Sequence, residues 1–205
     1  MELAEAVARY RDVFVDVGCG DGKWALRFAR AHPEAFVVGI DLSANAVASA
    51  SARAGRKPAR GGAENCAFVV GDALRPPGAL RGVAAEVLVA YPWGSLLRAV
   101  GEPQVEALSS LTALLRPGGR FVAYLNLSAA ADPGYAERLS LPGLDPDALV
   151  AGWEAAGLER VECSRLAPGE APAHRTSWGQ RLVRGAGRET LVVSAVRPAA
   201  ASAAS

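Results

Sequence analysis

The stretch VFVDVGCGDGKWALRFARAHP runs from Val13 to Pro33 and predicts a strand, a glycine turn and a helix in immediate succession. Residues 13–17 are β-branched or aromatic around a single acid, which is typical of a buried strand. Apolar side chains recur through residues 24–29, and Pro33 marks the end of the helix. A strand that passes through glycines directly into a helix is typical of the first unit of a nucleotide-binding α/β fold.

The same order of strand and helix recurs along the rest of the chain. Further strands are expected at residues 36–40, 66–73, 85–93, 120–127, 158–166 and 189–198. Helices are expected from Ser43 as N-cap to Gly55, from Pro103 to about Leu115, and from Pro146 to Gly157. Strands that alternate with helices imply right-handed crossovers. The predicted fold class is therefore α/β, a Rossmann-like doubly wound sheet of seven strands, mostly parallel.

The connection into the last strand, residues 166–188, is polar, basic and rich in glycine, unlike the earlier ones. A strand reached in this way can insert antiparallel, and we expect this for the seventh strand. No internal repeat or interdomain linker is visible, so residues 1–197 are expected to form a single domain. Residues 198–205, almost all alanine and serine, are expected to be a disordered tail.

The overall composition is that of one globular domain. The chain has 205 residues, 51% of them hydrophobic and 21% charged, and a net charge of +1. This balance produces no global field for nucleic acid or membrane, although a local patch can lie within a neutral total. Three separated cysteines and two histidines support neither a disulfide framework nor a metal site. With no signal-like or membrane-spanning run, we expect a cytoplasmic monomer without a membrane partner.

The glycine turn has the spacing G-x-G-x-G at Gly18, Gly20 and Gly22. A dinucleotide fingerprint needs its third glycine one position later, where this chain has Lys23. A nicotinamide dehydrogenase therefore fits the fold class but not the spacing. A turn without side chains lets a ligand approach the backbone closely, which favours a different nucleotide-like cofactor.

Two acids follow the next two predicted strands. Asp41 ends the second strand, where a carboxylate can accept hydrogen bonds from both hydroxyls of a ribose. Asp72, in the sequence Gly71-Asp72-Ala73, ends the third, where an adenine can be read. The carboxyl ends of parallel strands share one edge of the sheet, and open α/β sheets bind ligands there. The alternative is an ordinary turn followed by acids that only cap helices.

These three ordered signals resemble those of the class I S-adenosylmethionine-dependent methyltransferases. The resemblance implies that the glycine turn binds the methionine part, the acid after strand two the ribose, and the acid after strand three the adenine. The positions that match are Asp16, Gly18, Gly20, Asp41, Asp72 and the adjoining Ala73.

The fourth predicted strand ends in Tyr91-Pro92-Trp93-Gly94, which places a large aromatic side chain on a loop beside the expected cofactor. Pro92 restricts the backbone before the indole, and Gly94 permits an unusual turn after it. Stacking of a base on an aromatic side chain is worth about 1–3 kcal/mol. A base inside a nucleic-acid helix must be flipped out before it can react, and Trp93 is a candidate surface for the flipped base.

A second tryptophan, Trp178, lies in the late connection between hydroxyl and basic residues. Its neighbours are Thr176, Ser177, Arg175, Arg181, Arg184 and Arg188. Another acid-free basic stretch, RAGRKPAR, contains Arg53, Arg56, Lys57 and Arg60. Arginine suits phosphate because its planar fork binds two oxygens at once. Each stretch alone can be a solvated surface run, but the two together, one beside a tryptophan, favour RNA.

The segments PWGSLLR, KPARGG and TSWGQRL resemble the aminoglycoside-resistance methyltransferases that modify N1 of an adenine in the 16S rRNA decoding site, the kanamycin–apramycin type. The likeness runs from about residue 10 to residue 197. It implies that Pro92, Trp93 and Trp178 grip the flipped adenine and that Thr176 supports the cofactor or the base. The implied RNA contacts are Arg53, Arg56, Lys57, Arg60, Arg181, Arg184 and Arg188. Only about a dozen residues precede Val13, so the N-terminal hairpin of that family is not expected in full.

The expected function is therefore methyl transfer from S-adenosylmethionine to adenine N1 within the 30S subunit, conferring aminoglycoside resistance. Adenine N1 has a free lone pair at neutral pH, so the reaction needs no general base, and no His or Cys stands in a catalytic constellation. Catalysis would come from positioning. The alternatives are a methyltransferase that acts on tRNA or a small molecule, and a weakly active homologue that binds S-adenosylmethionine or RNA.

Overall fold

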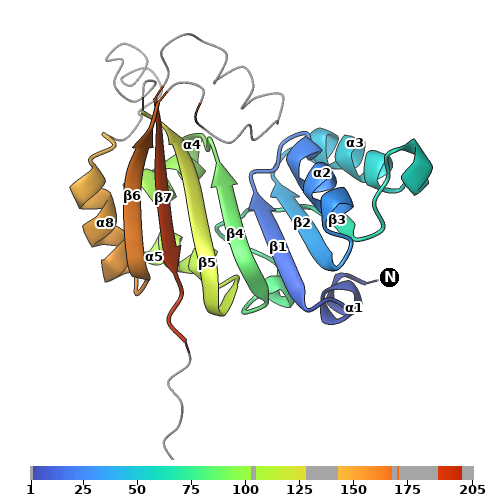
Figure 1. Cartoon of the computed structure of the whole chain (residues 1–205), viewed down its shortest axis with the longest axis horizontal. Helices are drawn as coiled ribbons and strands as arrows, with labels where there is room; N and C mark the ends of the chain where they lie inside the picture. Colours follow the sequence, from blue (N-terminus) through green and yellow to red (C-terminus); the bar gives the residue numbers. More distant parts are fainter. Residues whose placement is uncertain (1, 103–104, 128–142, 168–169, 171–188, 200–205) are drawn as a thin grey trace, which may run out of the picture.

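The computed structural model describes residues 2–102, 105–127, 143–167, 170 and 189–199, and within them the strands form one sheet (Figure 1). The strand order is β3-β2-β1-β4-β5-β7-β6. The strands are β1 (Asp12–Val17), β2 (Ala35–Asp41), β3 (Cys66–Val70), β4 (Ala84–Ala90), β5 (Leu115–Asn126), β6 (Glu159–Leu166) and β7 (Thr190–Val196). The predicted α/β class and the seven strands are confirmed.

The sheet is parallel except where β7 enters it. β1 pairs with β2 and β4, β2 with β3, and β4 with β5, all in parallel. β7 lies between β5 and β6 and is antiparallel to both, which confirms the predicted orientation of the last strand. Because the chain leaves β1 on one side for β2 and later returns on its other side for β4, the strand order reverses at β1. This reversal is where an open sheet forms a ligand crevice.

Helices cover both faces of the sheet. They are α1 (Leu3–Ala8), α2 (Lys23–Ala31), α3 (Ala44–Ala54), α4 (Gly94–Gly101), α5 (Val105–Thr112) and α8 (Pro146–Ala155), with 3-10 turns η1 (Pro58–Arg60) and η2 (Gly78–Leu80). Ser43 caps α3 as predicted, because its Oγ accepts from the backbone N–H of Ala46 at 3.3 Å. Asp145 caps α8 in the same way, with Pro146 in the first turn.

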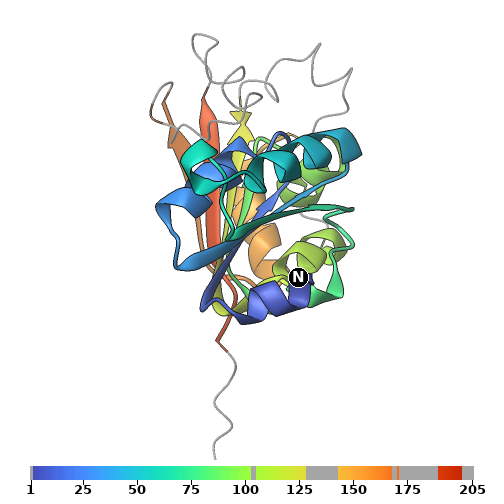
Figure 2. The ribbon, with the colours of Figure 1, turned by 90° about the vertical axis from the view of Figure 1, so that its right-hand side faces the viewer.

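Alternation along each strand divides the core between the two faces. Val13, Val15 and Val17 of β1 face a large cluster with side chains of α1, α4, α5 and α8. Phe14 faces the other way and packs with α2 and the end of α3. Trp153 of α8 is fully buried in the larger cluster, where it stacks on Phe121 of β5. Figure 2 shows α1 at the end of the strands opposite α3.

Three predicted boundaries are wrong. The helix expected to reach Leu115 ends at Thr112, because Leu115 already pairs with Ala84 at the start of β5. The strand expected to reach Trp93 ends at Ala90, because Tyr91 turns the backbone with φ +52°. The third strand ends at Val70 instead of residue 73, since Asp72 starts a turn by accepting from the N–H of Leu74. Pro103 lies outside the described residues.

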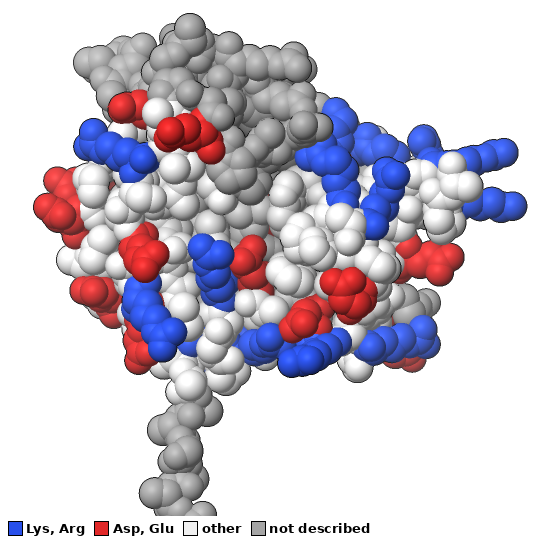
Figure 3. All heavy atoms as spheres, viewed as in Figure 1, with Lys and Arg blue, Asp and Glu red and all other residues white. Residues whose placement is uncertain are grey.

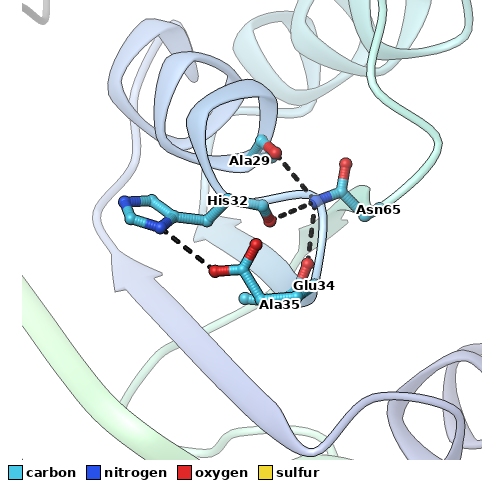
Figure 4. A network of polar contacts seen from close by, with 5 residues as sticks. All are labelled: Ala29, His32, Glu34, Ala35 and Asn65. Atoms are coloured by element: carbon cyan, nitrogen blue, oxygen red, sulfur yellow. Dashed lines mark hydrogen bonds and ion pairs between the residues drawn. The ribbon is translucent and has the colours of Figure 1, made fainter.

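At the edge of the sheet opposite the glycine turn, the side-chain amide of the buried Asn65 joins three segments of the chain (Figure 4). The Asn65 Nδ2 donates to the carbonyls of Ala29, His32 and Ala35 at 2.8, 2.9 and 2.8 Å. The first two carbonyls belong to the end of α2 and its C-cap, which have no partner within the helix. Asn65 therefore joins the end of α2, the start of β2 and the approach to β3, on the edge opposite the glycine turn.

Candidate functional site

A cleft of about 500 Å³ opens at the carboxyl ends of β1, β2, β3 and β4, within the size range of small-molecule sites. The residues that line it are Gly18, Cys19, Gly20, Asp21, Ile40, Asp41, Leu42, Gly71, Asp72, Ala73, Leu74, Ala90, Tyr91, Pro92, Trp93, Ser95 and Leu96. The structure thus brings together the predicted glycine turn, both strand-end acids, Ala73, Pro92 and Trp93. The cleft lies at the point where the strand order reverses.

The glycine turn is held against β2 by its own backbone. The N–H groups of Gly18 and Cys19 both donate to the carbonyl of Ile40, at 2.8 and 3.1 Å. Gly22 has φ +64°, and a Cβ at this position would collide with the ring of Phe68. The third glycine therefore serves close packing of the turn against β3 and a left-handed backbone, so any other residue would displace the turn.

Asp41 links the turn to the second strand. Its Oδ2 accepts from the N–H of Gly20 and its Oδ1 from the N–H of Ser43, both at 2.8 Å. Each carboxylate oxygen can accept a second hydrogen bond, so both oxygens keep a lone pair for the hydroxyls of a ribose. One side chain thus shapes the turn and presents acceptors to the cleft.

The third strand end combines a polar turn with an apolar wall. Asp72 accepts from the N–H of Leu74 at 2.9 Å and pairs with Arg75 at 3.3 Å. Leu42 also lines the cleft, although 69% of it is exposed. Leu42 and Leu74 supply apolar surface next to the acid, as a flat heterocycle such as adenine requires. The sequence analysis missed Leu42, and its signal was a large apolar residue directly after the strand-end acid.

Asp16 differs from the other predicted cofactor residues because it does not line the cleft. It is 2% exposed, and its Oδ2 has no hydrogen-bond partner among the described residues. Burial raises the pKa of this carboxyl to about 7, and the negative charges of Asp41 and Asp21 add to the shift. Asp16 therefore lies beneath the glycine turn as a buried carboxyl that holds its proton far above the usual pH range of an aspartate.

The substrate side of the cleft is the turn between β4 and α4. Pro92 is buried, and Trp93 is partly exposed where it lines the cleft. Gly94 has φ +57°, so the predicted unusual turn after the indole is present. Leu96 of α4 lies so near the glycine turn that a Cβ on Gly18 would be 3.1 Å from its Cδ2. The two sides of the cleft are thus in contact.

The partners predicted in the late connection lie outside the described residues. They are Thr176, Trp178, Arg181, Arg184 and Arg188. Their roles remain predictions that rest on the sequence resemblance.

The four predicted basic residues near α3 separate into two kinds. Arg56, Lys57 and Arg60 are exposed. Arg53 is partly buried instead, and its guanidinium donates to the backbone carbonyl of Asp21 in the glycine turn. Arg53 was predicted to contact RNA, but its guanidinium is used to hold the glycine turn.

One further basic residue joins the exposed group. Arg30 of α2 is exposed, and its Nη1 is 3.7 Å from where a Cβ of Gly61 would be, directly after Arg60. Lysines and arginines gather in Figure 3 on the side where Figure 1 places α2 and α3. We call Arg30, Arg56, Lys57 and Arg60 the basic ridge. The sequence analysis missed Arg30 because it is far from the other three along the chain.

Among the described residues, no group of three or more His, Cys, Asp or Glu side chains could hold a metal ion. No helix in those residues is long and apolar enough to cross a membrane.

A family model described as 16S rRNA (adenine(1408)-N(1))-methyltransferase, the NpmA family, matches residues 1–197. The chain belongs to this family. It is 38% identical over 185 residues to the 16S rRNA (adenine(1408)-N(1))-methyltransferase of Streptoalloteichus tenebrarius, covering 88% of this chain and 85% of the relative.

Solved structures from this methyltransferase family have the same fold. The enzyme from Catenulisporales acidiphilia has a TM-score of 0.81 and 36% identity, with 95% of this chain and 91% of that chain covered. The 16S rRNA methyltransferase KamB has a TM-score of 0.83 and 35% identity, with the same coverage. A mutant of the Catenulisporales enzyme was solved with its cosubstrate SAM. The predicted family, the class of enzyme and S-adenosylmethionine as cosubstrate are confirmed.

Proposed function

We propose that this chain methylates N1 of one adenine in the decoding site of 16S rRNA, within the assembled 30S subunit. The observation that carries the proposal is that one cleft contains both a cofactor site and Trp93. We call the cofactor site the cradle; its residues are Gly18, Gly20, Asp41, Leu42, Asp72 and Leu74. The chain would act as a monomer in the cytoplasm, where ribosomal subunits are found.

The cradle fits S-adenosylmethionine in shape and in chemistry. Gly18 and Gly20 allow the methionine part close to the backbone, Asp41 offers acceptors to the ribose, and Leu42 and Leu74 cover the adenine. Asp72 stands at the same strand end to read the edge of the adenine. The bound molecule supplies a methyl group already activated on a positively charged sulfur.

The substrate residues act by positioning. Trp93 provides a stacking face for the flipped adenine, Trp178 would close on its other face, and the backbone of Tyr91 or Pro92 would orient its edge. Adenine N1 carries its own lone pair, so no side chain has to remove a proton. Well-oriented reactants can gain roughly 7–11 kcal/mol from positioning alone.

Docking on the ribosome would use the charge of the basic ridge. The guanidinium and ammonium groups of the basic ridge suit rRNA phosphates, and Arg181, Arg184 and Arg188 would extend the contact near the base. Resistance to aminoglycosides would follow from the methyl group in the decoding site. The structure of NpmB1, an aminoglycoside resistance methyltransferase, is 36% identical to this chain with a TM-score of 0.76.

The experiment gives purified protein and methyl-labelled S-adenosylmethionine a choice of 30S subunits, free 16S rRNA and tRNA. The proposal predicts label in 30S subunits and much less in the free RNAs, because folded ribosomal RNA offers the docking surface. Label in tRNA instead would replace the proposed substrate. Label in no RNA would overturn the proposed activity.

A further inference from the structure

We infer that the hydroxyl pair of Tyr91 and Thr190 is a positioning device that fixes Trp93 relative to the strand that follows Trp178. The two hydroxyl oxygens are 3.2 Å apart, and both residues are 3% exposed. They are 99 positions apart in the sequence, one directly after β4 and the other at the start of β7. The pair therefore joins the turn that carries Trp93 to the start of β7.

The Tyr91 side of the pair is a strained turn. Tyr91 is one of two non-glycine residues with positive φ among the described residues, at +52°. A residue with a Cβ is held in this region only when its surroundings determine it. Its N–H donates to the carbonyl of Tyr124 at 2.8 Å, and its hydroxyl is held by Thr190. Pro92 and Trp93 follow at once, so the orientation of the indole depends on these two anchors.

The Thr190 side of the pair is the point where the chain re-enters the sheet. Thr190 pairs with Asn126 of β5 and with Leu166 of β6. Trp178 precedes it by twelve residues, and residues 171–188 lie outside those described. The hydrogen bond between the two hydroxyls thus joins the turn that carries Trp93 to β7, the strand that follows Trp178 in the sequence.

The pair contributes position and not proton transfer. Burial raises the pKa of the Tyr91 phenol, while the bond to Thr190 opposes the shift. The phenol therefore stays neutral at physiological pH, and its hydroxyl is hydrogen-bonded to Thr190. We therefore expect its loss to lower turnover while the cofactor cradle, built from other strands, keeps its affinity.

The test compares Tyr91→Phe, Thr190→Val and Thr190→Ser in the full-length protein. The first two remove one hydroxyl with little change of shape, and the serine variant keeps it. The net contribution of one hydrogen bond is small. Tyr91→Phe and Thr190→Val should therefore each lower kcat on 30S subunits about three- to tenfold. The affinity for S-adenosylmethionine, measured by calorimetry, should stay that of the unmodified protein. Thr190→Ser should recover most of the turnover.

Two controls separate positioning from a general loss of stability. Tyr10→Phe removes the same atom from a partly buried tyrosine that stacks on Phe36 at the opposite edge of the sheet, and it should leave kcat unchanged. The double variant Tyr91→Phe with Thr190→Val should lose no more than either single variant, because both delete one bond. A lower melting temperature with unchanged kcat would overturn the inference.

The kinetic readout rests on the proposed function, so a second readout avoids it. Protein labelled with 5-fluorotryptophan gives one fluorine resonance for each tryptophan, and Trp93→Phe assigns the resonance of Trp93. Tyr91→Phe and Thr190→Val should shift or broaden that resonance, and Thr190→Ser should not. An unmoved resonance overturns the positioning role, whereas an inactive unmodified protein overturns only the proposed function.

Discussion

The cofactor half and the substrate half of the cleft are built in different ways. In the cofactor half, the glycine turn is held by the end of β2, the next strand along the chain. The N–H of Gly18 donates to the carbonyl of Ile40, and the N–H of Gly20 donates to the carboxylate of Asp41. In the substrate half, the turn that carries Trp93 depends on Tyr124 and Thr190, which are distant in the sequence. Among the described residues, the first half is built from positions 18–74, whereas the second joins positions as far apart as 91 and 190.

This difference means that cofactor binding and methyl transfer should respond to different mutations. Contacts of the cofactor half join consecutive strand ends and support one another, so the cradle should exist without RNA. Contacts of the substrate half fix one aromatic face beside that cradle, and they matter only when a base arrives. Substitutions on each side therefore test whether the two halves are separable.

The largest effect is expected for Trp93→Ala. It removes a stacking face worth about 1–3 kcal/mol per base, so turnover on 30S subunits should fall about ten- to hundredfold. Calorimetry should still show S-adenosylmethionine binding, because the cradle is formed by β1, β2 and β3. Trp93→Phe keeps a smaller aromatic ring, so its turnover should lie between those of Trp93→Ala and the unmodified protein. Normal turnover of the alanine variant would remove Trp93 from the mechanism.

The complementary substitution in the other half is Asp41→Ala. It removes the acceptors offered to the ribose and the link to the N–H of Gly20. Hydrogen bonds to charged groups are worth about 1.5–3 kcal/mol, so the Kd for S-adenosylmethionine should rise about tenfold or more. At saturating cofactor, turnover should largely recover, unlike that of Trp93→Ala. An unchanged Kd would show that the carboxylate serves only the turn.

A smaller effect is expected on the basic ridge, which neither half of the cleft contains. Charge reversal by Arg30→Glu, or by Arg56→Glu with Lys57→Glu, should lower kcat/KM on 30S subunits about fivefold and flatten its salt dependence. Arg81→Glu reverses an exposed charge after η2 and is the matched control. Equal losses in the control and the ridge variants would show a general charge effect and no docking surface.

A prediction with no expected effect on turnover concerns Asp16, and it is measured as stability. Its pKa is about 7 in the folded protein against an ordinary value of 3.8 in the unfolded chain, so the folded state keeps a proton that the unfolded state has lost. Stability should therefore decrease as the pH rises from about 4 to about 7, by up to a few kcal/mol. Asp16→Asn removes this loss, so its melting temperature should increasingly exceed that of the unmodified protein across the window. Parallel profiles would show that Asp16 is ionised throughout.

The cofactor half was predictable because its signals are local. The strand, the glycine spacing and the acid at Asp41 are consecutive features of the chain, and the structure places them as expected. The antiparallel β7 also followed from the composition of the connection before it. Prediction from local sequence fails where packing decides the position of a side chain. Arg53 lies in a basic stretch, but its guanidinium turns inward to the glycine turn.

The substrate half was predictable only in part. Trp93 stood out as an aromatic between proline and glycine, but the bond from Tyr91 to Thr190 joins residues that no sequence spacing relates. Arg30 was missed for the same reason, since it meets the ridge only after α2 folds beside η1. Long-range contacts of this kind depend on the strand order, which composition and periodicity do not specify.

The central claim is that the two halves together act on one adenine N1 in the 30S subunit. Reverse transcription of 16S rRNA tests it directly. A methyl group on N1 blocks base pairing, so reverse transcriptase stops at the modified adenine. Subunits treated with protein and S-adenosylmethionine should give one new stop, at a single decoding-site adenine, and Trp93→Ala should give almost none. A stop at another position, or equal stops with both proteins, would contradict the account.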